Sequence, residues 1–365
     1  MTAYYVRSGA TGAGTGADWA NAYTAIATAT SGKAAGDIFY VSEDHSETVV
    51  GSPTFSTSGS LSNPSKIICV DHTGSVPPVS ADLRRTAVIG STSQMSTGGS
   101  TYWYGIIMAP GGAITLGSSS ANNYLVGCTI RVPSGANLQI NGSTSTSAAQ
   151  VFLDDTQVSF ASTTSSIKVS GDFTWLNTAS ALQGTAVPTT LFIWQGSTAN
   201  GVKITCRGVD FSAAGSGKTL VSNTATAGTV TVGLIDCKIN SAVTIVSAPS
   251  TPGGLTVDCT RVSSSGVNYT HARYRYQGTL TEETTIVRTT GGATDGTTPI
   301  AQKIVTTANS SVVFPFQSIP IAIWNDSRSQ QRCKAFGAAV RCQITTIFGP
   351  NVSISDRLVR RWRRS

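Results

Sequence analysis

The sequence predicts an all-β fold in which short strands stack as the coils of a parallel β-helix solenoid. Three observations predict it. Charged residues make up only 12 % of the 365 residues, about half of the roughly 25 % usual in globular domains. The chain has 37 glycines and long Ser, Thr and Ala stretches, which disfavour a large helical bundle. Short apolar segments also return along the chain with one shared local pattern, as solenoids require.

The first 48 residues are predicted to form a strand-helix cap. Tyr4-Tyr5-Val6 is a short β run, and Asp18 is a plausible N-cap for a helix from Trp19 to about Thr30. Residues 38–41 then form the next strand. We expect the aromatic side chains of this unit to lie over the first coil, because an open solenoid end needs covering.

Residues 49–267 are predicted to form the parallel β-helix. Their segments place apolar residues on both sides of a small or acidic residue. The intervals vary, with 22 residues between Cys237 and Cys259 and 31 between Cys206 and Cys237, so the loops vary while the coils repeat. A β-sandwich is the structural alternative. The recurring segments are 125–130, 152–158, 204–209, 234–239 and 255–262.

Residues 268–327 are predicted to be a separate, sandwich-like β-rich unit. Its three prolines suggest edge strands and turns. The expected strands are 274–276, 284–287, 312–314 and 319–324.

The charge of the chain lies at one end. The net charge is +7, yet residues 1–327 have a balance of −1 and residues 328–365 a balance of +8. A neutral body makes nucleic-acid binding an unlikely function, and a basic chain end is usually solvated. No segment reaches the roughly 18 apolar residues of a membrane span, so the sequence predicts no membrane partner.

The seven cysteines are widely spaced and form no Cys-x-x-Cys pair, which disfavours a zinc site. The five in residues 1–267 lie in apolar segments, and we expect them to be reduced core residues. Reduced thiols indicate assembly in a reducing cytoplasm. No cofactor or metal is expected.

Four carboxylates are the candidate catalytic residues, because polysaccharide hydrolases and lyases use grouped carboxylates. They fall at matching places of the recurring pattern, and Asp236 and Asp258 are expected on neighbouring coils. No Arg, Lys or His partner completes a catalytic set in the sequence. The simpler interpretation is that these residues bind turn amides. The four are Asp154, Asp155, Asp236 and Asp258.

Two histidine motifs are candidate sites. His45 lies in Glu43-Asp44-His45-Ser46-Glu47, which suits a cation or a base but equally a solvated loop. Asp71-His72 follows a strand that contains Cys69, and a Cys-x-x-His catalytic pair requires that thiol to be exposed. An alternating strand more often buries it.

Four aromatic residues are candidates for interactions. Tyr102, Trp103 and Tyr104 could stack on sugars, but neighbours on a strand alternate faces, so at most two line one surface. The fourth candidate is Trp324.

The opening segments 4–6, 18–23 and 36–41 resemble the first unit of right-handed parallel β-helix proteins of the pectate-lyase-like superfold. Segments 208–212, 273–279 and 319–326 look like structural proteins of tailed phages and prophages. The resemblance covers about residues 1–326. It implies a virion protein, and such β-helices serve as decoration, tail spikes and enzymes alike.

The end of the chain departs from this pattern. The resemblance implies polar strands and an acidic, aromatic end after Trp324-Asn325-Asp326, whereas this sequence continues with arginine clusters. A one-base shift of a back-translation of residues 341–354 yields a sequence of the expected type. Residues 328–365 are therefore expected to be a basic tail, either frameshifted or disordered.

The sequence as a whole predicts a non-enzymatic structural protein of a phage virion, most of all a capsid decoration or cement protein. The expected partners are the major capsid protein or tail subunits, together with copies of the chain itself in a trimer. The alternative is a tailspike or tail fibre that binds or cleaves host surface polysaccharide with its carboxylates.

Overall fold

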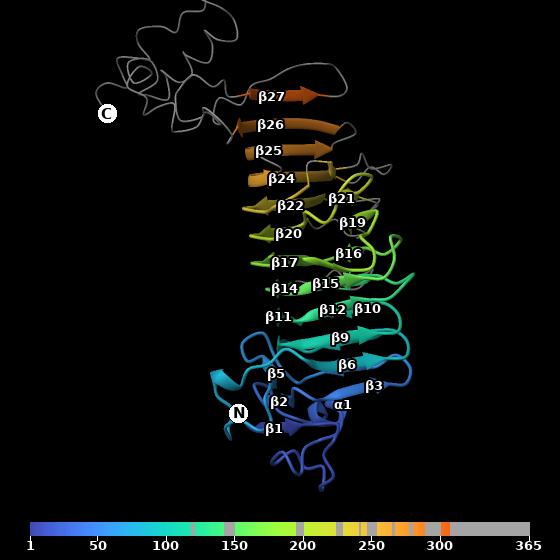
Figure 1. Ribbon diagram of the computed structural model, residues 1–365, viewed down its shortest axis with the longest axis vertical. Coiled ribbons are helices and arrows are strands. Elements are labelled where there is room, and N and C mark those ends of the chain that lie inside the picture. The colour runs from blue at the N-terminus through green and yellow to red at the C-terminus, as the bar shows by residue number, and fades with distance from the viewer. Residues whose placement is uncertain are drawn as a thin grey trace, which may run out of the picture.

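The fold is a column of stacked strands that runs from β1 at one end to β27 at the other (Figure 1). The computed structural model describes residues 1–117, 121–141, 150–194, 201–223, 229–240, 242–246, 254–264, 267–276, 280–288 and 301–306. Within these residues the strands form three long sheets that run parallel to the axis of the column.

The large sheet has 13 strands within the described residues. Its strands pair in parallel from β1 to β24 and antiparallel from β24 to β27. In spatial order they are β1 (Ala3–Val6), β2 (Ile38–Ser42), β5 (Ser65–Val70), β8 (Thr101–Tyr104), β11 (Asn123–Val126), β14 (Gln150–Asp154), β17 (Asp172–Leu176), β20 (Val202–Arg207), β22 (Thr229–Ile235), β24 (Gly254–Ser264), β25 (Val267–Tyr276), β26 (Leu280–Arg288) and β27 (Ala301–Thr306).

Two smaller sheets complete the coils. The six-stranded sheet contains β3 (Ser46–Val49), β6 (Ala87–Ser91), β9 (Ile106–Pro110), β12 (Thr129–Val132), β15 (Gln157–Phe160) and β18 (Leu182–Gly184). The eight-stranded sheet contains β4 (Thr54–Ser56), β7 (Met95–Gly98), β10 (Ile114–Leu116), β13 (Leu138–Ile140), β16 (Ile167–Val169), β19 (Thr190–Trp194), β21 (Thr219–Asn223) and β23 (Thr244–Val246).

The chain visits the sheets in a fixed order. From β2 to β19, each coil passes from the large sheet to the six-stranded sheet and then to the eight-stranded sheet, as in β8, β9 and β10. In the next two coils, β20 is followed directly by β21 and β22 by β23, both in the eight-stranded sheet. All pairings up to β24 are parallel, and a β-sandwich is built from antiparallel sheets. The parallel solenoid predicted from the sequence is therefore confirmed, and the sandwich alternative is wrong for this part of the chain.

The corner between the large and six-stranded sheets is a ladder of left-handed residues. Their φ angles lie between +46° and +70°, a region that Gly, Asn and Asp enter most readily. From Gly105 to Gly208, each corner N–H donates a hydrogen bond to the last carbonyl of the next strand, at 2.9–3.1 Å, and the Asp236 N–H donates to Thr260 within β24 at 2.9 Å. The ladder consists of Gly105, Gly127, Asp155, Asn177, Gly208, Asp236 and Arg261.

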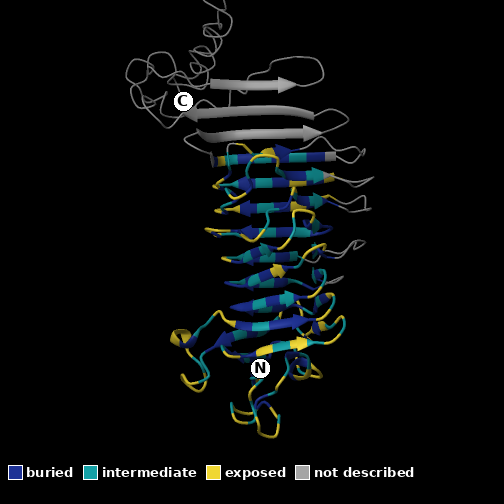
Figure 2. Cartoon of the chain, turned by 45° about the vertical axis from the view of Figure 1, so that its right-hand side comes forward, coloured by how far each residue is buried: buried dark blue, intermediate teal, exposed yellow. Residues whose placement is uncertain are grey.

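Buried and partly exposed residues alternate along many of the strands (Figure 2), and the buried ones form the core in rows that follow the axis. One row in register along the large sheet is Ile67, Trp103, Leu125, Leu153, Trp175, Cys206, Leu234 and Cys259. Every member is at most 1 % exposed. Phe173, Trp175, Phe192 and Phe211 form an aromatic cluster in the middle coils, with ring centroids 5.5–6.4 Å apart.

The helix predicted from Trp19 to Thr30 is wrong in its extent, because α1 covers only Ile26–Thr30. The Asp18 carboxylate accepts the N–H of Asn21 at 2.7 Å and so closes a turn instead of capping a helix. Tyr23 is held in a bridge with Val6, where its N–H donates to the Tyr5 carbonyl at 2.9 Å. At the start of α1, the N–H of Ile26 donates to the carboxylate of Glu47, and not to Asp18, at 3.2 Å.

The coils begin earlier than the sequence predicted. β2 and β3 already belong to the large and six-stranded sheets, so the first coil starts at Ile38 and not at residue 49. No helix among the described residues is long and apolar enough to cross a membrane.

The strand pairing changes at the other end of the solenoid. β25 and β26 confirm the strands predicted at 274–276 and 284–287, and they pair antiparallel within the large sheet. A separate unit is therefore not seen for these strands. The strands expected at 312–314 and 319–324, Trp324 and the basic tail 328–365 lie outside the described residues.

Candidate functional site on the outer face of the large sheet

The candidate catalytic carboxylates lie at or near the left-handed corner. Asp155 and Asp236 both occupy corner positions, so these two match as predicted. Asp154 is the residue before the corner, at the end of β14. Asp258 does not match: it lies inside β24 in register with Gly233, and the corner of its coil is Arg261. The error came from aligning the dipeptide Asp236-Cys237 with Asp258-Cys259. In the paired strands, Asp258 lies three positions before Arg261, the residue that corresponds to Asp236.

Asp236 has arginines from both neighbouring coils beside it. Arg261 donates through Nε at 2.5 Å and through Nη2 at 2.8 Å, and the Arg207 Nε lies 3.9 Å away. The hydrogen bond from Arg261 lowers the pKa of the Asp236 carboxyl below its ordinary value. A general acid needs the opposite shift, so this environment suits a stabilising ion pair between coils.

Asp155 also has an arginine partner, whereas Asp154 is bonded by a side-chain amide. Arg85 donates to the Asp155 carboxylate at 2.6 Å, and the Asn177 amide donates to Asp154 at 3.1 Å. The sequence did not reveal these partners, because each comes from another coil.

The three consecutive aromatics divide between two faces, as an alternating strand requires. Trp103 is fully buried, and its indole N–H donates to the Asn123 side-chain oxygen at 3.3 Å. Its inclusion among the interaction candidates is therefore wrong. Tyr102 and Tyr104 point outward from β8 and are partly exposed.

The outward positions of the neighbouring strands carry further apolar side chains that sequence reasoning missed. One row in register is Ile38, Lys66, Tyr102, Tyr124 and Phe152, and a second is Tyr40, Ile68, Tyr104 and Val126. All of them are of intermediate exposure. We call these nine residues the tyrosine face. Tyr124 directly precedes the recurring segment 125–130, and Phe152 is the first residue of the segment 152–158, a signal that could have identified them.

Two rings of the tyrosine face stack on each other. The Tyr124 and Phe152 rings stack with centroids 4.7 Å apart and planes inclined by 7°. This separation equals the spacing of neighbouring strands, so these two rings stack along the axis and each covers one face of the other. Sugars that stack on aromatics need a free ring face. With four tyrosines and one charged side chain among its nine residues, this surface instead resembles the core of a protein–protein interface.

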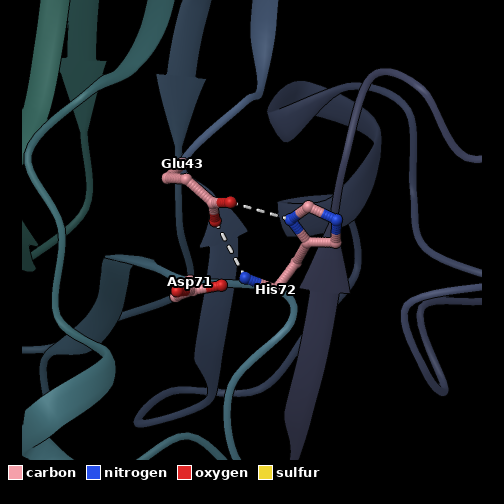
Figure 3. A group of neighbouring side chains, drawn as sticks. All are labelled: Glu43, Asp71 and His72. Atoms are coloured by element: carbon pink, nitrogen blue, oxygen red, sulfur yellow. Dashed lines mark hydrogen bonds and ion pairs between the residues drawn. The ribbon is translucent and has the colours of Figure 1, made fainter.

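A cluster of possible metal ligands lies where β2 and β5 end (Figure 3). Glu43, Asp71 and His72 hold ligand atoms within 4.8 Å of one another. The Glu43 carboxylate is bonded by the His72 backbone N–H at 2.8 Å and lies 2.9 Å from its Nδ1. Asp71 accepts from Arg84 at 2.8 Å and from the Thr73 hydroxyl at 2.6 Å.

These contacts give the cluster a structural role. Arg84 already neutralises Asp71, and both oxygens of Glu43 have a partner, so a cation would have to displace existing bonds. The cluster fixes the loop of residues 71–83 to the first coil, and the Trp19 ring packs edge-on to His72 with centroids 6.0 Å apart.

The other predicted thiol and histidine sites are buried. Cys69 is fully buried, and burial raises the pKa of its thiol, so it is not an exposed nucleophile. His45 is 1 % exposed and not in a solvated loop as the simpler interpretation held. Its Nε2 lies 3.7 Å from Glu47, the residue whose carboxylate meets the start of α1.

Comparison with known proteins gave no match, whether against protein-family models, curated proteins or solved structures.

Proposed function

We propose that this chain is a non-enzymatic structural protein of a phage virion, and first of all a capsid decoration protein. In this proposal the solenoid is right-handed, which is the usual hand for parallel strands joined by crossovers. Residues 1–37, which precede the first coil, act as a cap. The chain is assembled in the host cytoplasm and docks on other virion subunits.

The observation that carries the proposal is the tyrosine face. Its first row extends over five neighbouring strands of the sheet and its second over four, with Lys66 as the one charged residue among the nine. In the second row, Asp154 of β14 comes next after Val126. Tyrosine is enriched and charge is depleted in the cores of protein–protein interfaces. A rigid surface also loses little entropy on binding.

The alternative, a glycan-cleaving tailspike, has weaker support. Its best pair, Asp236 and Asp258, is out of register by three positions, and Asp236 is engaged by Arg261. Polysaccharide hydrolysis needs two carboxylates that flank one bond, one of them with a raised pKa. Asp236 has a lowered one.

Incorporation into particles tests the proposal. A phage lacking its own copy of the gene is supplied with the chain in trans, and particles are purified by density gradient. We expect the wild-type chain to copurify with particles and Tyr124→Ser/Phe152→Ser to be depleted at least tenfold. Gln139→Ser, at an outward position of β13 in the eight-stranded sheet, is the control. Equal incorporation of all three chains would refute docking through the tyrosine face.

A further inference from the structure

The loop that joins β5 to β6 exposes an apolar tip. Val76 is 65 % exposed and Val79 is 51 % exposed, and Pro77 between them is also exposed. Few large apolar side chains among the described residues are as open to solvent. The loop projects sideways from the column beside β2 and β5, where its short helical turn is drawn in cyan (Figure 1).

The loop is held rigidly despite its exposure. The buried Asp82 carboxylate accepts the N–H of Val79 at 2.9 Å and of Ser75 at 3.1 Å. The base of the loop is fixed by Arg84 on Asp71 and by His72 on Glu43. A rigidly held apolar tip loses little conformational entropy when it binds, which is typical of an interaction anchor.

The same chain carries an apolar groove of about 320 Å³. It runs along the axis where β9, β12, β15 and β18 end, and these ends are in register. Its size is at the lower limit for small-molecule pockets, which suits a few aliphatic side chains. The apolar and small residues that line it include Pro110, Val132, Pro133, Phe160, Ala161 and Gly184.

The groove is kept open by its small residues. A side chain at Gly184 would lie 2.4 Å from the Phe160 carbonyl oxygen, so that position stays bare. Phe160 and Val132 are buried beneath the surface, whereas Ala161 is exposed. Arg131 is the one charged residue of the lining, so the groove offers an apolar occupant a nearly neutral site.

We propose that the tip at Val76–Val79 of one chain seats in this groove of a second copy. The two surfaces match in chemistry, since one presents exposed aliphatic side chains and the other an open aliphatic recess. The tip projects on the left of Figure 1, whereas β9 and β15 end on the right, so one chain does not fill its own groove. Such a contact is heterologous and closes into a ring or extends into a chain of copies.

Sedimentation velocity of the purified full-length chain over a concentration series tests the proposal, which does not depend on a virion role. We expect the wild type to self-associate. Val76→Ser/Val79→Ser removes the apolar side chains of the tip, and Ala161→Gln fills the groove with a polar side chain. Each is expected to weaken association at least tenfold. Leu61→Ser, at a leucine that is 61 % exposed in the loop before β5, and Thr164→Gln, at an exposed position outside the groove, should leave it unchanged.

Mixing the two defective chains gives the sharpest result. The tip variant keeps its groove and the groove variant keeps its tip, so an equimolar mixture should form a one-to-one dimer that neither forms alone. A wild type that stays monomeric at all concentrations would overturn the proposal. Undiminished association of the tip variant would also overturn it. So would the absence of a dimer in the mixture, provided that both variants have the circular dichroism spectrum of the wild type.

Discussion

Arg85 reaches across Gly127 to bind Asp155, and its Nη1 lies 2.6 Å from the Asp155 Oδ2 although 70 residues separate the two in sequence. A Cβ atom at Gly127 would lie 2.6 Å from the Arg85 Cζ. The bare corner at Gly127 is therefore what lets the arginine pass from its own coil to Asp155. The guanidinium also lies over the Tyr104 ring, 5.7 Å from its centroid.

Gly127→Ala should destabilise the chain more than Arg85→Ala. Alanine in the left-handed region costs about 1–2 kcal/mol, and it would also displace the arginine. The ion pair itself is half exposed, with side chains 50 % and 49 % exposed, so its loss should cost less than about 1 kcal/mol. Urea unfolding measures both variants. In an Arg85→Ala background the cost of Gly127→Ala should fall, and additive costs would contradict the steric account.

Trp175→Ala should open a cavity in the middle of the solenoid and cost about 3–5 kcal/mol. The side chain is fully buried, and its indole N–H donates to the Thr156 carbonyl at 2.9 Å and to the Thr178 hydroxyl at 3.0 Å. Thermal unfolding followed by circular dichroism measures the loss. The outward Tyr102→Ala is the matched control, and an equal effect of the two would argue against the inward placement of Trp175.

The described thiols should not react in the folded chain. Burial raises the pKa of Cys128 to about 12 and that of Cys237 to about 11, and only the thiolate is nucleophilic. Alkylation at about pH 8, read by peptide mass spectrometry, should leave Cys69, Cys128, Cys206, Cys237 and Cys259 unmodified until urea is added. Rapid native labelling of Cys128 would contradict its burial.

Acid should weaken the N-terminal coils. The hydrogen bond from Arg7 lowers the pKa of Asp44 to about 2. A carboxylate with a lower pKa in the folded state contributes stability above its unfolded pKa, near 3.9, and loses it as pH falls through the folded value. Urea midpoints should therefore drop between about pH 5 and pH 2. Arg7→Gln should make that drop shallower, and an unchanged slope would count against the pair.

The sequence predicted the solenoid because each coil repeats a local pattern, in which apolar residues flank the corner between two sheets. It overestimated the helix at Trp19–Thr30, since the bridge of Tyr23 to Val6 is a tertiary contact that overrides local helical spacing. It misplaced Asp258 because a shared Asp-Cys dipeptide does not say which residues of two strands are paired. The tyrosine face was missed for the same reason: Tyr124 and Phe152 are neighbours only once β11 and β14 are paired.

Cryo-electron microscopy of the intact particle tests the central claim most directly. The account predicts density for this solenoid on the capsid lattice, at copy numbers that match its symmetry axes, with Tyr102, Tyr124 and Phe152 against a neighbouring subunit. Density confined to the tail tip, with the tyrosine face open to solvent, would contradict it.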